Sequence, residues 1–153
     1  LLDAVPSSVA NDGMKLPGSL TVQGRTPLML AAAQGYVHVV ALLLSHLCDV
    51  DAQDAATGDT AVMCAARGGH AHCVALLVRA GARLDTANAA GQTALMYALG
   101  AAHGLPRAAR VSKALLQGLP PLHVLQLLTQ RDADGWTPVH FACKSGLVLP
   151  WVR

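Results

Sequence analysis

The chain has 153 residues, of which 53% are apolar and 13% are charged, and its formal net charge is +2. So many apolar residues with so little net charge are enough for one folded domain, which excludes a disordered chain. No block of like charges occurs, which excludes a nucleic-acid partner held by bulk charge. The core must be aliphatic, because 28 Ala, 25 Leu and 15 Val stand beside two Trp, two Tyr and one Phe.

The first 21 residues differ from the rest of the chain. They contain two Pro and two Gly and do not share the repeated pattern of the later residues. Because the chain begins with Leu and has no signal-peptide pattern, we expect a fragment or a processed piece of a longer protein. Residues 1–21 are expected to be a linker or the remnant of an upstream repeat, and residues 22–153 the folded domain.

The stretch from residue 26 to residue 48 has no formal charge and raises the question of a transmembrane helix. Gln34 and Gly35 interrupt it, so it lacks the roughly 18 consecutive apolar residues that a span requires. The next stretch of the chain repeats its pattern with charges inserted. We therefore expect no membrane span.

Four segments of the chain repeat one pattern, and each begins with a glycine. They read GRTPLMLAAAQG, GDTAVMCAARGG, GQTALMYALGAA and GWTPVHFACKSG, and they begin at Gly24, Gly58, Gly91 and Gly135. The glycines are 34, 33 and 44 residues apart. A repeat with a period near 33 residues indicates a solenoid of stacked units.

Each unit predicts two short helices. A threonine hydroxyl can cap the first helix, and a proline directly after it loses no hydrogen bond. The predicted capping residues are Thr26, Thr60, Thr93 and Thr137. Gly35 and Gly69 can end the first helices in the left-handed conformation. The second helices share an apolar face, made of Val39, Leu42 and Leu43 in one unit and Cys73, Leu76 and Leu77 in the next.

Helices of two to three turns are too short to be stable alone, so each pair must stack on the next. The stretches GRTPLMLAAAQGYVHVVALLLSHLCDVDAQD and GDTAVMCAARGGHAHCVALLVRAGARLDTAN resemble ankyrin repeats. The resemblance implies an all-α solenoid of helix–turn–helix units with short β-hairpin turns between the repeats. It implies units at about 22–54, 55–88 and 89–132, and a partial unit at 133–153. His140 stands at the histidine of the family's T-P-L-H pattern, where the resemblance implies a structural hydrogen bond. The other three units have a methionine at this position, and these methionines are expected to lie in the core: Met29, Met63 and Met96.

The third unit contains an insertion of 11 residues. We place its second helix at about 106–117, ended by Gly118, and treat GLPPLHVLQ (118–126) as an extra loop because two prolines oppose helix continuation. The alternative places the second helix at 122–129. The fourth unit stops after its first helix, whose Val139 and Ala142 are expected to be buried against unit three. We expect self-association through this uncapped C-terminal end, unless residues 147–153 form a cap.

No pattern indicates catalysis or a bound metal. The chain contains no Glu, no G-x-S-x-G nucleophile motif and no phosphate-binding glycine loop. The best zinc-like cluster is Cys64 with HAHC at 70–73, but the helical register turns His72 away from Cys73. All four cysteines (Cys48, Cys64, Cys73 and Cys143) occupy small or apolar positions, which is typical of reduced thiols. We expect no enzyme activity, no metal and no cofactor, and we expect an intracellular protein, cytoplasmic or nuclear. A zinc-dependent module is a further hypothesis, beside the two binding roles described next.

The resemblance implies a non-catalytic scaffold that binds another protein through hairpin tips and first-helix edges. The alternative is a regulatory ankyrin segment of a larger enzyme, channel or ubiquitin-ligase subunit. The residues at the family's recognition positions are Arg25, Gln34, Asp54, Asp59, Arg67, Asn88, Gln92, Asp132, Asp134, Trp136 and Lys144, with Gln53 and Thr57 also at the tips.

The position between the Gly and the Thr of each unit is expected to face solvent, since it holds charged residues in two of the units. Trp136 is therefore the expected anchor for a partner, unless it packs on the insert around Leu122. Arg107, Arg110 and Lys113 form a basic stripe on the helix at 106–117. This stripe is either a solvated helix face or a site for an acidic peptide or a lipid headgroup.

Overall fold

A computed structural model describes residues 23–46, 48–100 and 104–146, and these residues form eight helices and no strand. The predictions for residues 1–21 and 147–153 lie outside the described residues. The helices are α2 (Pro27–Gln34), α3 (Val37–Ser45), α4 (Ala61–Gly68), α5 (Ala71–Arg79), α6 (Ala94–Gly100), α7 (Leu105–Leu116), α8 (Pro121–Thr129) and α9 (Pro138–Lys144).

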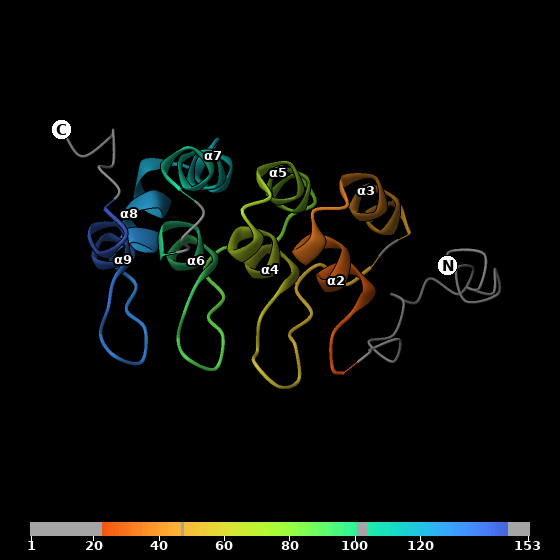
Figure 1. Cartoon of the computed structure of the whole chain (residues 1–153), viewed down its shortest axis with the longest axis horizontal. Helices are drawn as coiled ribbons and strands as arrows, with labels where there is room; N and C mark the ends of the chain where they lie inside the picture. Colours follow the sequence, from red (N-terminus) through yellow and green to blue (C-terminus); the bar gives the residue numbers. More distant parts are fainter. Residues whose placement is uncertain (1–22, 47, 101–103, 147–153) are drawn as a thin grey trace.

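The helices stack in two rows. The first row contains α2, α4, α6 and α9, and the second row contains α3, α5 and α7 (Figure 1). Each helix of a row packs on the next one in that row, and the loops between repeats project from the first row, away from the second row (Figure 1). The predicted all-α helical repeat fold is confirmed. Its stability comes from contacts between neighbouring repeats, because no single pair of short helices can bury both of its apolar faces.

The ends of the first helices agree with the sequence signals in most repeats. The hydroxyl of Thr26 accepts a hydrogen bond of 3.2 Å from the backbone N–H of Met29, as expected for a cap. Gly35 and Gly69 end their helices at φ values of 77° and 74°. Thr60 differs, because its hydroxyl is buried and makes no hydrogen bond. Thr60 still occupies the N-cap position of α4, so the predicted start of this helix is confirmed and only the hydrogen bond predicted for its hydroxyl is wrong.

The fourth residue of the T-P-L-H pattern is structural in every repeat. Nδ1 of His140 accepts a hydrogen bond of 3.0 Å from the backbone N–H of Thr137 and lies 2.7 Å from the Thr137 hydroxyl oxygen. This pair fixes the first turn of α9, which confirms the expected hydrogen bond. The methionines of the other repeats are fully buried, as predicted: Met29, Met63 and Met96.

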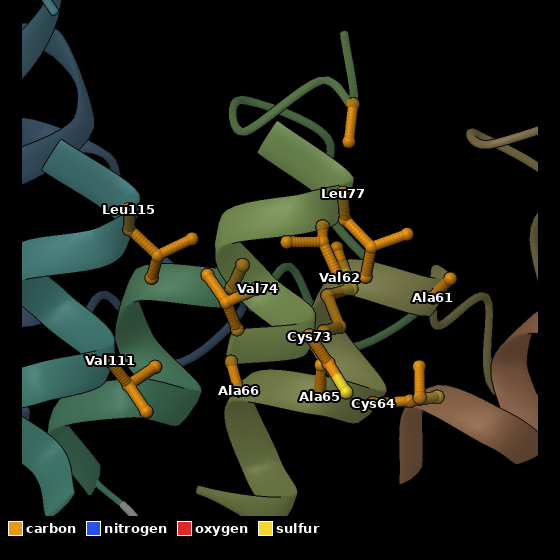
Figure 2. Close-up of a cluster of buried hydrophobic side chains, with 14 of the residues drawn as sticks. Ala61, Val62, Cys64, Ala65, Ala66, Cys73, Val74, Leu77, Val111 and Leu115 are labelled. Carbon is orange, nitrogen blue, oxygen red and sulfur yellow. The ribbon is translucent and has the colours of Figure 1, made fainter. Parts of the chain in front are cut away.

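The core lies between the two rows and between successive repeats. Small residues on α4 let α5 approach closely, while branched side chains of α5 and α7 meet beside them (Figure 2). The side chains that form this part of the core are Val62, Cys64, Ala65, Ala66, Cys73, Val74, Leu77, Val111 and Leu115. The tight fit of small and branched residues explains the near-absence of aromatic side chains from the sequence.

The third repeat, which contains the insertion, has two helices after α6. The helix predicted at about 106–117 is present as α7, and Gly118 comes after it at a φ of 81°. The segment predicted as an extra loop is wrong, because α8 begins at Pro121 and packs against α9. α7 ends at Leu116, before both prolines, and Pro121 occupies the first position of α8, where its missing N–H has no intrahelical partner.

Equivalent positions differ in burial between the middle and the ends of the stack. Cys73 is fully buried on α5, whereas Val39 at the same position of α3 is 37% exposed. Val62 is 1% exposed, whereas Val139 at the same position of α9 is 38% exposed. The core positions predicted for Val39, Leu42 and Val139 are therefore wrong. Among the described residues, α3 and α9 each stand at the end of a row, so one of their sides has no repeat packed on it.

Candidate interaction surface

Three loops connect the repeats, and each is a tight turn closed by two backbone hydrogen bonds, one of which joins the two ends of the loop. The backbone N–H of Asp54 donates to the carbonyl of Asp59 over 2.8 Å, and that of Asp132 donates to the carbonyl of Trp136 over 2.9 Å. The loop that contains Asn88 is closed in the same way by Gln92. The first loop spans one residue more than the others, as its sequence predicts.

The loop tips are also joined to one another. Ala89 donates its backbone N–H to the carbonyl of Thr57 over 3.0 Å, and Ala133 donates to the carbonyl of Ala90 over 3.0 Å. The side chain of Gln53 donates to the carbonyl of Ala87 in the next loop. The loops therefore form one connected edge with a fixed spacing between neighbouring tips.

Asp59 lies at the centre of a buried polar network. The expectation that it faces solvent is wrong, because only 1% of its surface is exposed. One carboxylate oxygen accepts from the side-chain amide of Asn88 over 2.8 Å and from the hydroxyl of Tyr97 over 3.2 Å. The other oxygen accepts from Arg67 over 3.2 Å. These bonds join the first loop to the second loop and to α6, so Asp59 is a structural residue.

Tyr97 completes this network, although it is not among the recognition residues expected from the sequence. Its ring lies under the guanidinium of Arg67, 5.6 Å from the ring centroid. The pKa of the Tyr97 hydroxyl is raised by burial and by the nearby carboxylate of Asp59. The sequence contained a signal for this role, since Tyr97 stands at a core position of its helix, where a tyrosine hydroxyl requires a polar partner.

Asp54 plays the same structural role in the first loop, where it is buried. Its carboxylate accepts from the backbone N–H of Ala56 over 2.9 Å and forms an ion pair with Arg25 over 3.1 Å. The hydrogen bond from Ala56 lowers the pKa of Asp54 most, and the contact with Arg25 lowers it further against the opposing effect of burial. Asp54 is not accessible to a partner in this arrangement.

The lowered pKa of Asp54 predicts an acid-dependent contribution to stability. The carboxyl group of Asp54 has a lower pKa in the folded protein than in the unfolded chain, so its ionised form stabilises the fold. This contribution is fully present at pH values above the unfolded pKa and is lost as the pH falls through the folded pKa. We expect Asp54→Asn to reduce the free energy of unfolding at about pH 7 and to reduce it less at about pH 2. Urea unfolding at both pH values measures the difference. An equal loss at both would contradict the prediction.

Two further predicted recognition residues use their side chains to build turns. Oδ1 of Asn88 accepts from the backbone N–H groups of Ala90 and Gln92. Oδ1 of Asp132 accepts from those of Asp134 and Trp136, the latter over 2.7 Å. Both side chains are half-buried, and Oδ1 of each accepts two backbone hydrogen bonds within its own loop.

Trp136 is the large aromatic side chain exposed on this edge, with 39% of its surface accessible. Its ring packs edge-on to His140 and lies 5.7 Å from the ring of Phe141, centroid to centroid. The ammonium of Lys144 lies 5.2 Å from the Trp136 centroid. These ring contacts are all with α9, whereas Leu122 on the insert is 71% exposed. The contacts support one side of the indole and leave the rest accessible.

The predicted recognition residues thus separate into two groups. Asp54, Asp59, Asn88 and Asp132 hold the loops in shape. The remaining residues are exposed or half-exposed along the loops and the first row of helices: Arg25, Gln34, Arg67, Gln92, Asp134, Trp136 and Lys144.

The thiols are not arranged for chemistry. Burial raises the pKa of Cys48, Cys64 and Cys73, which keeps these thiols protonated. Cys143 is exposed, although it occupies the small position that Ala66 fills in the core of the second repeat. No three His, Cys or Asp side chains among residues 23–46, 48–100 and 104–146 lie together as metal ligands would.

Comparison with known proteins identifies one family. A model of ankyrin repeats, with three copies, matches residues 28–118. No curated protein matches the chain. None of the helices in the described ranges has the length and apolar character needed to cross a membrane.

Proposed function

Because this chain belongs to the ankyrin-repeat family, whose repeats are generally protein–protein interaction modules, we propose that it is a non-catalytic scaffold that binds a partner protein. The partner contacts the loop tips and the adjoining ends of the first-row helices. This surface is the loop edge, and it contains Arg25, Gln34, Arg67, Gln92, Asp134, Trp136 and Lys144. The free thiols, two of them buried, further support an intracellular location, cytoplasmic or nuclear.

The accessible indole of Trp136 is the observation on which this proposal rests. Tryptophan and arginine dominate binding energy at protein interfaces, because each can bury a large, preordered surface. Trp136 is preordered, since Phe141 and His140 support its ring. Arg67 is preordered too, because Asp59 and Tyr97 fix its guanidinium while its side chain stays 41% exposed. The two residues give a partner an aromatic and a cationic anchor.

We expect Trp136→Ala to weaken partner binding by about 2 kcal/mol, or about 30-fold in Kd, while the melting temperature changes little. Partners captured from a cell extract on the immobilised full chain are identified by mass spectrometry. One is then purified, and its Kd is measured by calorimetry for the wild type and the variant.

The matched control is Leu122→Ala, which removes an exposed apolar side chain from α8, outside the loop edge. It is expected to leave the Kd within about twofold of the wild type. If Trp136→Ala binds every purified partner as tightly as the wild type, the loop edge is not the recognition surface. A large loss of stability with binding intact would assign Trp136 to the fold alone.

A further inference from the structure

Charged residues are segregated between the helices and the loops. None of the eight described helices contains an acidic residue, and the chain contains no Glu. The aspartates of the described residues all lie in the connections between repeats: Asp49, Asp51, Asp54, Asp59, Asp85, Asp132 and Asp134. Cations on the helices of the second row therefore have no acidic neighbour on their own helix.

The cations of the second row concentrate on α7. Arg107, Arg110 and Lys113 are all exposed, whereas Ala108 and Val111 on the opposite side of the helix are buried. None of the three cations forms an ion pair or a hydrogen bond with another described residue. The exposed end of α5 adds another cation, Arg79. This positive surface has no counter-charge from the part of the chain that the structure describes, and it is available to an external anion.

We propose that the exposed face of α7, defined by Arg107, Arg110 and Lys113, binds an acidic segment of a partner protein. The three cations span about 9 Å along the helix axis, at a rise of about 1.5 Å per residue. Side chains on one face of an extended segment lie about 7 Å apart, and the long, flexible side chains of arginine and lysine can each reach a different carboxylate of such a segment. The match is one of charge.

A protein segment fits this face better than a membrane surface does. Each cation near an anionic bilayer contributes only about 1 kcal/mol, so stable attachment also needs an apolar group that inserts into the lipid. Among residues 106–116 of α7, no large hydrophobic side chain is exposed. Leu122 and Leu125 are exposed, but they belong to α8. Charge pairing with carboxylates requires no such insertion.

This face is separate from the loop edge. It lies in the second row of helices, whereas the loops project from the first row in the other direction (Figure 1). Two partners, or two parts of one partner, can therefore bind at the same time. Failure of binding at one surface leaves the proposal for the other surface intact.

The test uses a fluorescein-labelled peptide of eight glutamates and the full chain, with binding measured by fluorescence anisotropy at low salt. The variant Arg107→Gln/Arg110→Gln is compared with Arg83→Gln/Arg131→Gln, which removes two exposed cations from the loops. Both variants lower the net charge by the same amount. We expect the α7 variant to weaken binding about fivefold or more and the loop variant less than about twofold.

Circular dichroism of both variants confirms that the helices are intact. An equal loss of affinity in the two variants would overturn the proposal, because it would show attraction by net charge without a defined site. Absence of peptide binding to the wild type would also overturn it. A third outcome would also overturn the proposal: the wild type binds phosphatidylserine vesicles but not the peptide, and the α7 variant does not bind the vesicles. The face of α7 would then bind a membrane.

Discussion

Replacing Asp59 by Ala is expected to destabilise the protein by about 3 kcal/mol, a large fraction of the total stability of a small domain. The change removes the acceptor for three donors at once, from Asn88, Tyr97 and Arg67. Buried donors left without a partner cost about 1–3 kcal/mol each. The cost at Arg67 is the smallest, because this side chain is partly exposed and water can solvate it.

Urea unfolding followed by circular dichroism measures the loss. The control is Asp85→Ala, which removes a carboxylate that is 47% exposed and forms an ion pair with Arg83, itself 66% exposed. Exposed ion pairs contribute roughly 0–1 kcal/mol, so this variant should unfold close to the wild type. If the two variants lose the same stability, Asp59 does not hold the repeats together as the structure indicates.

Gly91→Ala is expected to cost about 2–4 kcal/mol, because two effects add. Gly91 has a φ of 74°, where a side chain is strained. A Cβ atom there would also lie 2.8 Å from the backbone nitrogen of Ala133 and 3.0 Å from Cα of Asp132. The next loop would have to move away, which would lengthen the hydrogen bond between Ala133 and the carbonyl of Ala90.

Gly135→Ala separates the two effects. Gly135 has a φ of 83°, but a Cβ atom there meets no atom within 4 Å. We expect Gly135→Ala to lower the free energy of unfolding by only about 1 kcal/mol, which is the cost of the backbone conformation alone. The difference between the two variants, measured by thermal and urea unfolding, gives the cost of separating neighbouring loops. Equal losses would mean that the loop tips are not held against each other.

The local features of the sequence were enough to predict the repeat architecture. The threonine positions set where the first helix of each repeat begins, and Gly35 and Gly69 set where α2 and α4 end, because capping and left-handed turns depend on residues within one turn of the chain. The period near 33 residues required stacking, since helices this short are unstable alone. The buried position of the three methionines came from the same register, whereas the hydrogen bond of His140 was implied by the resemblance to ankyrin repeats.

The tertiary structure alone decided which of the equivalent positions are buried and which polar residues are free. Asp59 and Trp136 occupy the same place in the repeat pattern, yet one is buried and the other is accessible. Asp59 is buried because Tyr97 and Asn88, 38 and 29 residues further along the chain, fold over it. Val39 and Val139 are exposed because they stand at the ends of the rows. The physical reason is that a repeat pattern encodes each residue's place within its own unit, whereas burial depends on the neighbouring unit that packs against it.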